Sequence, residues 1–199
     1  MSELHSTPDC IGLVLAAGAG QRFGSDKRRA QLADGNSLLR ATVLRAQEAF
    51  SDVRVVIKTE DDAQALAIPS DVQLVRAAHA KQGMGSSLAA GIQSLANTQA
   101  TAVAVLLGDM PWISVATLQQ LRAQADAEHI VVAYCEGQRG HPVLFGRRFW
   151  PQLMQLHGEN GAKGLIASHA QQVITVTLTD SGILRDVDTP ADLSHPPIS

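Results

Sequence analysis

Residues 13–28 read LVLAAGAGQRFGSDKR, an apolar run that gives way to small residues and glycines and then presents Arg22, Lys27 and Arg28. The apolar part is typical of a buried β-strand, and the glycines allow backbone conformations that other residues avoid. N–H groups in such a loop can approach an anion, and basic side chains donate charge-assisted hydrogen bonds to phosphate oxygens. The stretch predicts a strand followed by a polyphosphate-binding loop; the alternative is a tight turn with solvated basic residues.

The remaining chain alternates short β-branched runs with longer helical patterns. The spacing predicts strands at 11–16, 53–58, 72–75, 101–107 and 130–134, and helices at 37–50, 86–96 and 115–127. Strands as continuously apolar as AVAVLL are usually covered on both faces. The pattern therefore predicts an α/β fold with a mostly parallel sheet and helices on both faces.

A different rhythm follows residue 135. The segment 137–145 is typical of a glycine-bounded loop that leads into a strand, and 147–156 and 161–170 have the pattern of short helices. Residues 173–178 and 182–190 are predicted to form a late strand pair. No Ser/Pro-rich linker, low-complexity tract or internal repeat interrupts this part of the chain, so it is expected to elaborate the same domain.

The bulk composition limits what the protein can be. A chain of 199 residues, 45% apolar and 18% charged, fits one domain with a large core, here residues 1–199 with flexible tails at 1–10 and 194–199. The formal charge of -3 gives no broad basic surface, so nucleic acid and anionic membranes are not expected as partners. Cys10 and Cys135 lack a metal or disulfide pattern, and no apolar run reaches the ~20 residues of a membrane span. These features predict a cytoplasmic protein.

Two rival nucleotide-binding motifs do not match the loop after the first strand. A P-loop requires Lys and then Ser or Thr directly after its glycine, and GSDKR at 24–28 provides neither. The run GAGQRFG at 18–24 is similar to a dinucleotide-binding motif, but its last glycine comes one place late. The loop is therefore expected to bind phosphate in another way.

A carboxylate follows the strand predicted at 101–107. In LLGDMPWIS, residues 106–114, Asp109 stands between Gly108 and Pro111. Because the carboxyl ends of parallel strands meet at one edge of a sheet, Asp109 is placed to hold Mg²⁺ against a triphosphate bound by the first loop. The alternative is an aspartate that caps a helix or a turn.

Two further aspartates stand near the C-terminus. Asp186 and Asp188 alternate along a stretch predicted to be extended, so their side chains are expected to point to opposite faces. At most one of them is then expected to meet the metal held by Asp109, and Asp188 is the candidate. Asp188 has the alternative of capping a helix that begins at Pro190.

Together these pieces resemble a known family. LAAGAGQRFGSDK at 15–27 resembles the LAAGxSxRMGxxK signature of the MobA-like nucleotidyltransferases, and the match runs over roughly residues 11–193, nearest to the molybdenum cofactor cytidylyltransferase branch. Glu159 and Lys163 stand where Asp and Arg are common in that family. Its other landmarks are similar to GMGSSL at 83–88, LGDMP at 107–111, GHPVLF at 140–145, GENGAKGLI at 158–166 and DVDTPADL at 186–193.

The resemblance implies a Rossmann-like, Mg²⁺-dependent nucleotidyltransferase. A terminal phosphate of the acceptor attacks the α-phosphate of a nucleoside triphosphate, and pyrophosphate leaves. The resemblance implies catalytic roles for Arg22, Lys27 and Asp109, metal ligation by Asp109 and Asp188, and an acceptor site at Pro111, Gly140, His141 and Pro142. For His141 the alternative is that it only caps the start of a strand. It implies nucleotide binding by Leu15, Ala16, Ala17, Gly18, Ala19, Gly20, Arg22, Lys27, Gly83, Met84, Gly85, Ser86 and Ser87.

The choice of substrates follows from the same resemblance. GMGSSL is similar to the cytidylyl branch, which implies CTP in preference to GTP, a phosphorylated pterin (molybdopterin) as acceptor, and a molybdoenzyme that receives the product. A glycine-rich helix start capped by serine is the alternative for this stretch. Two other functions stay open: a nucleotidyltransferase for a sugar or polyol phosphate, and a non-catalytic carrier or chaperone of the cofactor.

Overall fold

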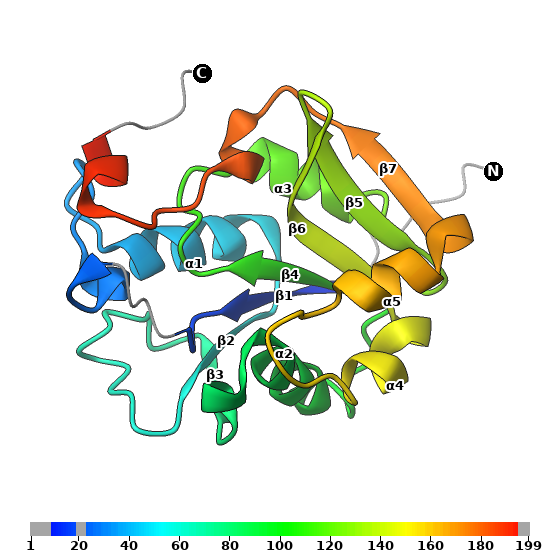
Figure 1. Ribbon diagram of the computed structural model, residues 1–199, viewed down its shortest axis with the longest axis horizontal. Coiled ribbons are helices and arrows are strands. Elements are labelled where there is room, and N and C mark those ends of the chain that lie inside the picture. The colour runs from blue at the N-terminus through cyan, green and yellow to red at the C-terminus, as the bar shows by residue number, and fades with distance from the viewer. Residues whose placement is uncertain (1–8, 19–22, 195–199) are drawn as a thin grey trace.

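The computed structural model describes residues 9–18 and 23–194. One sheet of seven strands runs through this part of the chain in the order β3-β2-β1-β4-β6-β5-β7 (Figure 1). β6 is antiparallel to both of its neighbours, and the other neighbouring strands are parallel. The mostly parallel sheet is confirmed. Its strands are β1 (Cys10–Leu15), β2 (Val53–Lys58), β3 (Gln73–Ala77), β4 (Ala102–Leu107), β5 (Ile130–Cys135), β6 (Gln138–Gly146) and β7 (Val173–Thr177).

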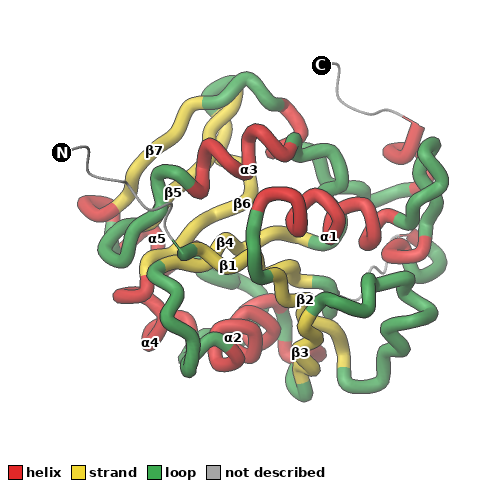
Figure 2. The backbone as a smooth tube through the Cα atoms, turned by 180° about the vertical axis from the view of Figure 1, so that it is seen from behind, coloured by secondary structure: helices red, strands yellow, loops and turns green. Residues whose placement is uncertain are grey.

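Helices cover both faces of this sheet, as predicted (Figure 2). On one face lie α1 (Leu38–Ala49) and α3 (Val115–Arg122), and on the other α2 (Met84–Ser94), α4 (Trp150–Leu153) and α5 (Lys163–Ser168). Serine side chains begin two of the helices, because Ser37 accepts from the Arg40 N–H and Ser114 from the Thr117 N–H. Short 3₁₀ helices lie at Lys27–Arg29, Ala80–Gln82, Arg147–Phe149, Ala170–Gln172, Ser181–Leu184 and Pro190–Ser194.

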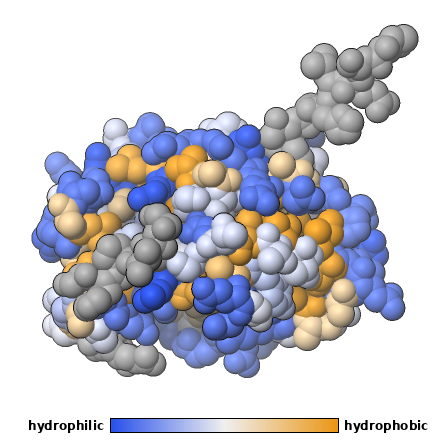
Figure 3. Space-filling model, turned by 90° about the horizontal axis from the view of Figure 1, so that it is seen from above, coloured by the Kyte–Doolittle hydropathy of each residue, from blue (hydrophilic) through white to orange (hydrophobic). Residues whose placement is uncertain are grey.

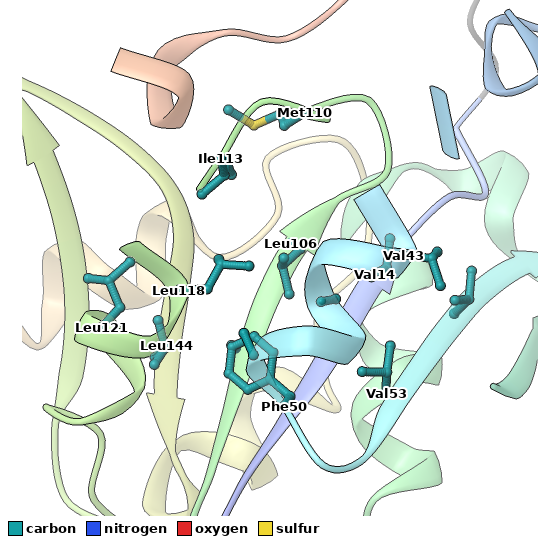
Figure 4. Packing of buried hydrophobic residues seen from close by; sticks show 14 of the residues in the cluster. Val14, Val43, Phe50, Val53, Leu106, Met110, Ile113, Leu118, Leu121 and Leu144 are labelled. Atoms are coloured by element: carbon teal, nitrogen blue, oxygen red, sulfur yellow. The ribbon is translucent and has the colours of Figure 1, made fainter. Parts of the chain in front are cut away.

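The core consists of two apolar clusters separated by the sheet. Neighbouring residues of one strand enter different clusters: Leu106 packs with the α1 and α3 side, and Val105 with the α2 side. This is the two-residue alternation of a strand that is buried on both faces. Figure 4 shows the first cluster, in which Leu118 of α3 and Val43 of α1 lie on either side of Leu106.

Two details of the late segments differ from the prediction. Residues 182–190 do not form a strand, because Ser181–Leu184 is a 3₁₀ helix and 185–188 has no regular structure. The backbone of this segment bonds to loops instead of a strand, since the Val187 N–H donates to Asp109 O at 3.0 Å. The predicted loop at the start of 137–145 is already part of β6, where Arg139 pairs with Tyr134 of β5.

The carboxyl ends of β1, β2 and β4 meet at one edge of the sheet. Leu15 at the end of β1 is paired with Leu107 at the end of β4 and with Val56 of β2. The C-terminal segment, red in Figure 1, returns to this edge beside the blue segment that follows β1. Open α/β sheets bind their ligands at such an edge.

The surface and the helices show no sign of a membrane-spanning helix among the described residues. Seen from above, apolar surface residues lie in several patches among hydrophilic ones (Figure 3). Within the described residues, the large hydrophobic side chains that are exposed are Leu74 and Met84. None of the described helices combines the length and the apolar character that crossing a bilayer requires.

Candidate active site

A lysine joins two carboxylates at this edge of the sheet. Nζ of Lys27, in the 3₁₀ helix after the β1 loop, lies 2.8 Å from Oδ2 of Asp109 and 3.2 Å from Oδ1 of Asp188. It also donates to the Val187 carbonyl at 2.9 Å. Burial lowers the pKa of Lys27, but the bonds to the two aspartates outweigh burial and the net shift is upward. The ammonium therefore stays charged, and three residues singled out from the sequence lie together.

A third carboxylate completes this cluster. Asp109, Asp186 and Asp188 each offer an oxygen, and these oxygens lie within 4.8 Å of one another. The expectation that Asp186 and Asp188 point to opposite faces is wrong, because residues 185–188 are irregular and the alternation of a strand does not apply there. Burial raises the pKa of Asp186, and the negative charges of Asp188 and Asp109 raise it further.

This carboxylate cluster fits a divalent cation. Oδ1 of Asp109 is buried and has no hydrogen-bond partner among the described residues. A buried carboxylate oxygen without a donor is costly unless a cation or water satisfies it. Carboxylate oxygens are the ligands that Mg²⁺ and Mn²⁺ prefer, so Asp109, Asp186 and Asp188 are the residues that would hold such an ion.

Arg28, next to Lys27, binds groups that connect parts of the fold. Its guanidinium binds Asp61 through two bonds of 2.6 and 2.8 Å, pairs with Asp26 at 2.7 Å and donates to the Ala16 carbonyl at 2.9 Å. Burial opposes its charge, but the two carboxylates raise the pKa of Arg28 overall. This side chain ties the end of β1 to the loop after β2, and its donors are already used within the protein.

Two adjoining cavities open beside the first strand. We call the first, of about 330 Å³, the β1-loop cavity; its walls include Leu15, Ala16, Gly18, Lys27, Lys58 and Asp109. The second, of about 620 Å³, is the α2 cavity, lined among others by Leu15, Ala17, Gly18, Lys58, Lys81, Gly83, Met84, Ser87 and Asp109. Because they share four of these residues, they form one cleft. Its size suits a nucleoside triphosphate.

Two further candidates for nucleotide binding, Ser86 and Gly85, do not line these cavities. Ser86 is buried, and its hydroxyl has no partner among the described residues, but it lines neither cavity. Gly85 also lies outside both linings, and its N–H already donates to the Gly158 carbonyl at 2.8 Å. Ala19, Gly20 and Arg22 lie outside the described residues.

The glycines of GMGSSL have a packing role that the sequence did not indicate. A Cβ atom at Gly83 would lie 2.5 Å from the backbone carbon of Gly158, and one at Gly85 would lie 2.8 Å from His157 O. Gly83 also has a φ of 111°, which side chains with a Cβ rarely adopt. The start of α2 therefore carries glycine because the backbone of residues 157–159 packs directly on it.

A third cavity shares Met84 with the α2 cavity. This β6 cavity, of about 390 Å³, is bounded by strands β4 and β6 and by residues 159–163. Gly140 and His141, predicted acceptor residues, line it, whereas Pro111 and Pro142 line none of the three cavities. Burial lowers the pKa of His141, and its Nδ1 atom is buried with no partner among the described residues.

Sequence reasoning missed several polar residues of the cleft. Lys58 lines both the β1-loop and α2 cavities, and Glu159 lines both the α2 and β6 cavities. Lys58 is the last residue of β2, so its place at the carboxyl end of a parallel strand was an available signal. Asp186 could not be found in this way, because the shape of its segment depends on contacts distant in sequence.

Comparison with known proteins supports the resemblance seen in the sequence. The chain is 30% identical over 197 residues to the purine catabolism protein PucB of Bacillus subtilis, covering 94% of this chain and 95% of PucB. It is 35% identical over 150 residues to the bifunctional protein GlmU of Granulibacter bethesdensis, where the match covers 72% of this chain and 31% of GlmU.

Solved structures with the same fold also support this resemblance. The crystal structure of Rv0371c from Mycobacterium tuberculosis superposes with a TM-score of 0.80 at 28% identity, covering 95% of this chain and 97% of that one. A complex of the same protein with manganese gives a TM-score of 0.76 at 27% identity, covering 94% and 96%. The fold is nucleotide-diphospho-sugar transferase-like. Because the model of the MobA-like NTP transferase domain matches residues 12–173, the chain belongs to that family.

Proposed function

We propose that this protein is a single-domain, divalent-metal-dependent nucleotidyltransferase that joins a nucleoside monophosphate from CTP to a phosphorylated acceptor and releases pyrophosphate. The observation that carries the proposal is the cluster of Lys27 with Asp109, Asp186 and Asp188, of which Lys27 and Asp109 line the β1-loop cavity. Phosphoryl transfer needs alignment and charge neutralisation more than covalent help, and this cluster is suited to both.

The charged residues of the cleft have different roles in the proposed reaction. Lys27, Lys58 and Lys81 bring positive charge to the walls of the nucleotide cavities. An oxygen of the acceptor phosphate forms a new bond to the α-phosphorus. The bond from the α-phosphorus to the oxygen that bridges it to the β-phosphorus breaks, and pyrophosphate leaves with the negative charge. Lys27 is placed to stabilise that charge. Mg²⁺ held by the three aspartates would act as a Lewis acid on the phosphate oxygens, and the manganese complex of Rv0371c supports a divalent ion. No side-chain nucleophile is needed.

The proposal also includes the identity of the acceptor and of the nucleobase. We take the acceptor to be molybdopterin and the nucleobase to be cytosine, because GMGSSL resembles the cytidylyl branch and the α2 cavity is lined by Gly18, Gly83 and Ser87. Contacts that fit one base leave polar groups of another unpaired, at about 1–3 kcal/mol each. CTP is therefore expected to exceed GTP by about 10² in kcat/KM.

Release of pyrophosphate tests the function directly. Purified protein with Mg²⁺ is offered CTP or GTP together with molybdopterin, a sugar phosphate or a polyol phosphate. Turnover with CTP and molybdopterin is the expected result. Turnover with a sugar or polyol phosphate alone would move the protein to another substrate class, and a preference for GTP would overturn the cytidylyl assignment. Binding of cofactor without turnover under every condition would indicate a carrier.

A further inference from the structure

The β6 cavity is lined by alternate residues of one strand. Arg139, His141, Val143 and Phe145 all line it, although the pairing of β6 with β5 is irregular between Arg139 and Val143. Gly140 lies between them, and a Cβ atom there would come within 2.4 Å of Ile183 O on the opposite side. The strand therefore presents a row of side chains to the cavity in which the polar members, Arg139 and His141, lie toward its start.

The deep wall of the cavity is apolar and its rim is charged. Leu88 of α2, Val105 of β4 and Ile166 of α5 join Val143 and Phe145 in the lining, and all five of these side chains are buried. Exposed polar residues complete the lining: Arg139, Glu159, Asn160 and Lys163. Such a pocket suits a ligand with an apolar body and an anionic group at one end.

Within the described part of the chain, the two cations of this rim, Arg139 and Lys163, have no ion-pair partner, unlike the cations near the carboxylate cluster. Lys27 and Arg28 are committed to aspartates, whereas Arg139 and Lys163 make no ion pair or side-chain hydrogen bond with any other described residue. Both act electrostatically on His141, as does Asp109. Arg139, Lys163 and His141 all line the β6 cavity.

We propose that Arg139 and Lys163 bind the phosphate group of the acceptor and determine which acceptors are used. This inference rests on the proposed function, and it assigns a role in acceptor binding to two residues that were not among the predicted acceptor residues. An acceptor phosphate must approach three carboxylates and a triphosphate, so repulsion has to be offset on its own side. Arg139 and Lys163 supply that charge, and the apolar wall takes the body of the acceptor.

Binding of 1-naphthyl phosphate tests the site without turnover. This fluorescent compound combines an apolar ring with a phosphate, and it is titrated without nucleotide or metal into wild type, Arg139→Met and Lys163→Met. We expect its affinity to fall at least about tenfold in each variant, the size of one lost charge-assisted hydrogen bond. Arg139→Lys should recover part of the loss. Arg45→Met on α1 is the matched control with one cation removed elsewhere. Lys81→Met reports whether the probe binds in the α2 cavity instead.

These experiments distinguish failure of this inference from failure of the proposed function. No saturable binding to wild type, wild-type affinity in both variants, or an equal loss in Lys81→Met would overturn the assignment. In steady-state assays, Arg139→Met and Lys163→Met should raise the KM of the acceptor at least about tenfold while the KM of the nucleotide stays unchanged. If nucleotides are transferred but the KM of the acceptor is unaltered, this inference fails and the proposed function stands. If no acceptor is turned over, the titration still decides whether the anion site exists.

Discussion

Nζ of Lys27 lies 2.8 Å from Oδ2 of Asp109, although the two residues follow different strands of the sheet. The parallel pairing of β1 with β4 brings them together, since both strands end at the same edge. In this state the ammonium supplies the positive charge that the three neighbouring carboxylates need. A divalent ion would have to share these oxygens with Lys27 or use those that it leaves, such as the buried Oδ1 of Asp109.

The first prediction is that Lys27→Met makes stability depend on metal. Without the ammonium, the oxygens of Asp109, Asp186 and Asp188 within 4.8 Å repel one another. In EDTA, Tm should fall by roughly 2–4 °C, which corresponds to about 1 kcal/mol in a domain of this size. Mg²⁺ should reverse more of this loss than it adds to wild type, as measured by thermal denaturation. Arg45→Met controls for loss of a cation, and equal Mg²⁺ responses in all three proteins would contradict the prediction.

A second prediction concerns turnover by the same lysine. If the ammonium of Lys27 follows charge onto the departing pyrophosphate, Lys27→Ala should lower kcat more than it weakens nucleotide binding. Single-turnover rates and equilibrium titration of the nucleotide separate the two effects. An effect on binding alone would place Lys27 in ground-state recognition only.

For Asp109 we expect a large kinetic effect and a small structural one. Asp109→Asn should reduce kcat/KM by about 10² or more, because it removes charge from a residue that we propose as a principal ligand of the metal. Asp109 follows β4 at the edge of the sheet and is partly exposed, so far-UV circular dichroism should match wild type. Asp71→Asn, at an exposed site outside the cleft, is the control. Near-normal turnover of Asp109→Asn in Mg²⁺ would remove this residue from the mechanism.

Two glycines should respond to alanine in opposite directions. Gly83→Ala places a Cβ atom 2.5 Å from Gly158 and forces alanine to a φ of 111°, so it should destabilise the protein by about 2 kcal/mol or more. Gly164→Ala lies in α5 and meets no atom within 4 Å, so it should stabilise by about 0.4–1 kcal/mol. Urea denaturation measures both. A neutral Gly83→Ala would show that residues 157–159 do not hold this close packing in solution.

Stability should also depend on pH through Asp180. Burial raises its pKa, but hydrogen bonds from the Ser114 N–H, the Thr117 hydroxyl and the Gly182 N–H outweigh burial and lower it overall. A lowered folded-state pKa stabilises the protein above the unfolded value of about 3.9, and this contribution is lost as pH falls through the folded value.

Asp180→Asn tests that sign. The variant should be less stable than wild type by about 1–2 kcal/mol at pH 7. The gap should be unchanged at pH 5 and should narrow below about pH 4, where wild type takes up the proton. Urea unfolding at the three pH values measures the gap, and a constant difference down to pH 3 would contradict the assignment.

The sequence by itself determined the sheet, its helical layers and the main residues of the site. The apolar run at 53–58 is β2 to the residue, because continuous β-branched residues are stable only when both faces are buried. Lys27 and Asp109 could be paired in advance, since each follows a strand of a parallel sheet whose carboxyl ends meet. These features depend on local pattern and on one general rule of topology.

Tertiary structure decided the rest, because contacts distant in sequence fix it. Residues 182–190 resemble a strand, but Val187 bonds to Asp109 O and to Lys27 Nζ, so the segment crosses the end of the sheet and turns Asp186 toward the other carboxylates. The glycines at the start of α2 are explained by the backbone of residues 157–159, which no local pattern connects to them. Contacts with residues far along the chain stabilise these loop conformations. A short stretch of sequence therefore does not predict the conformations.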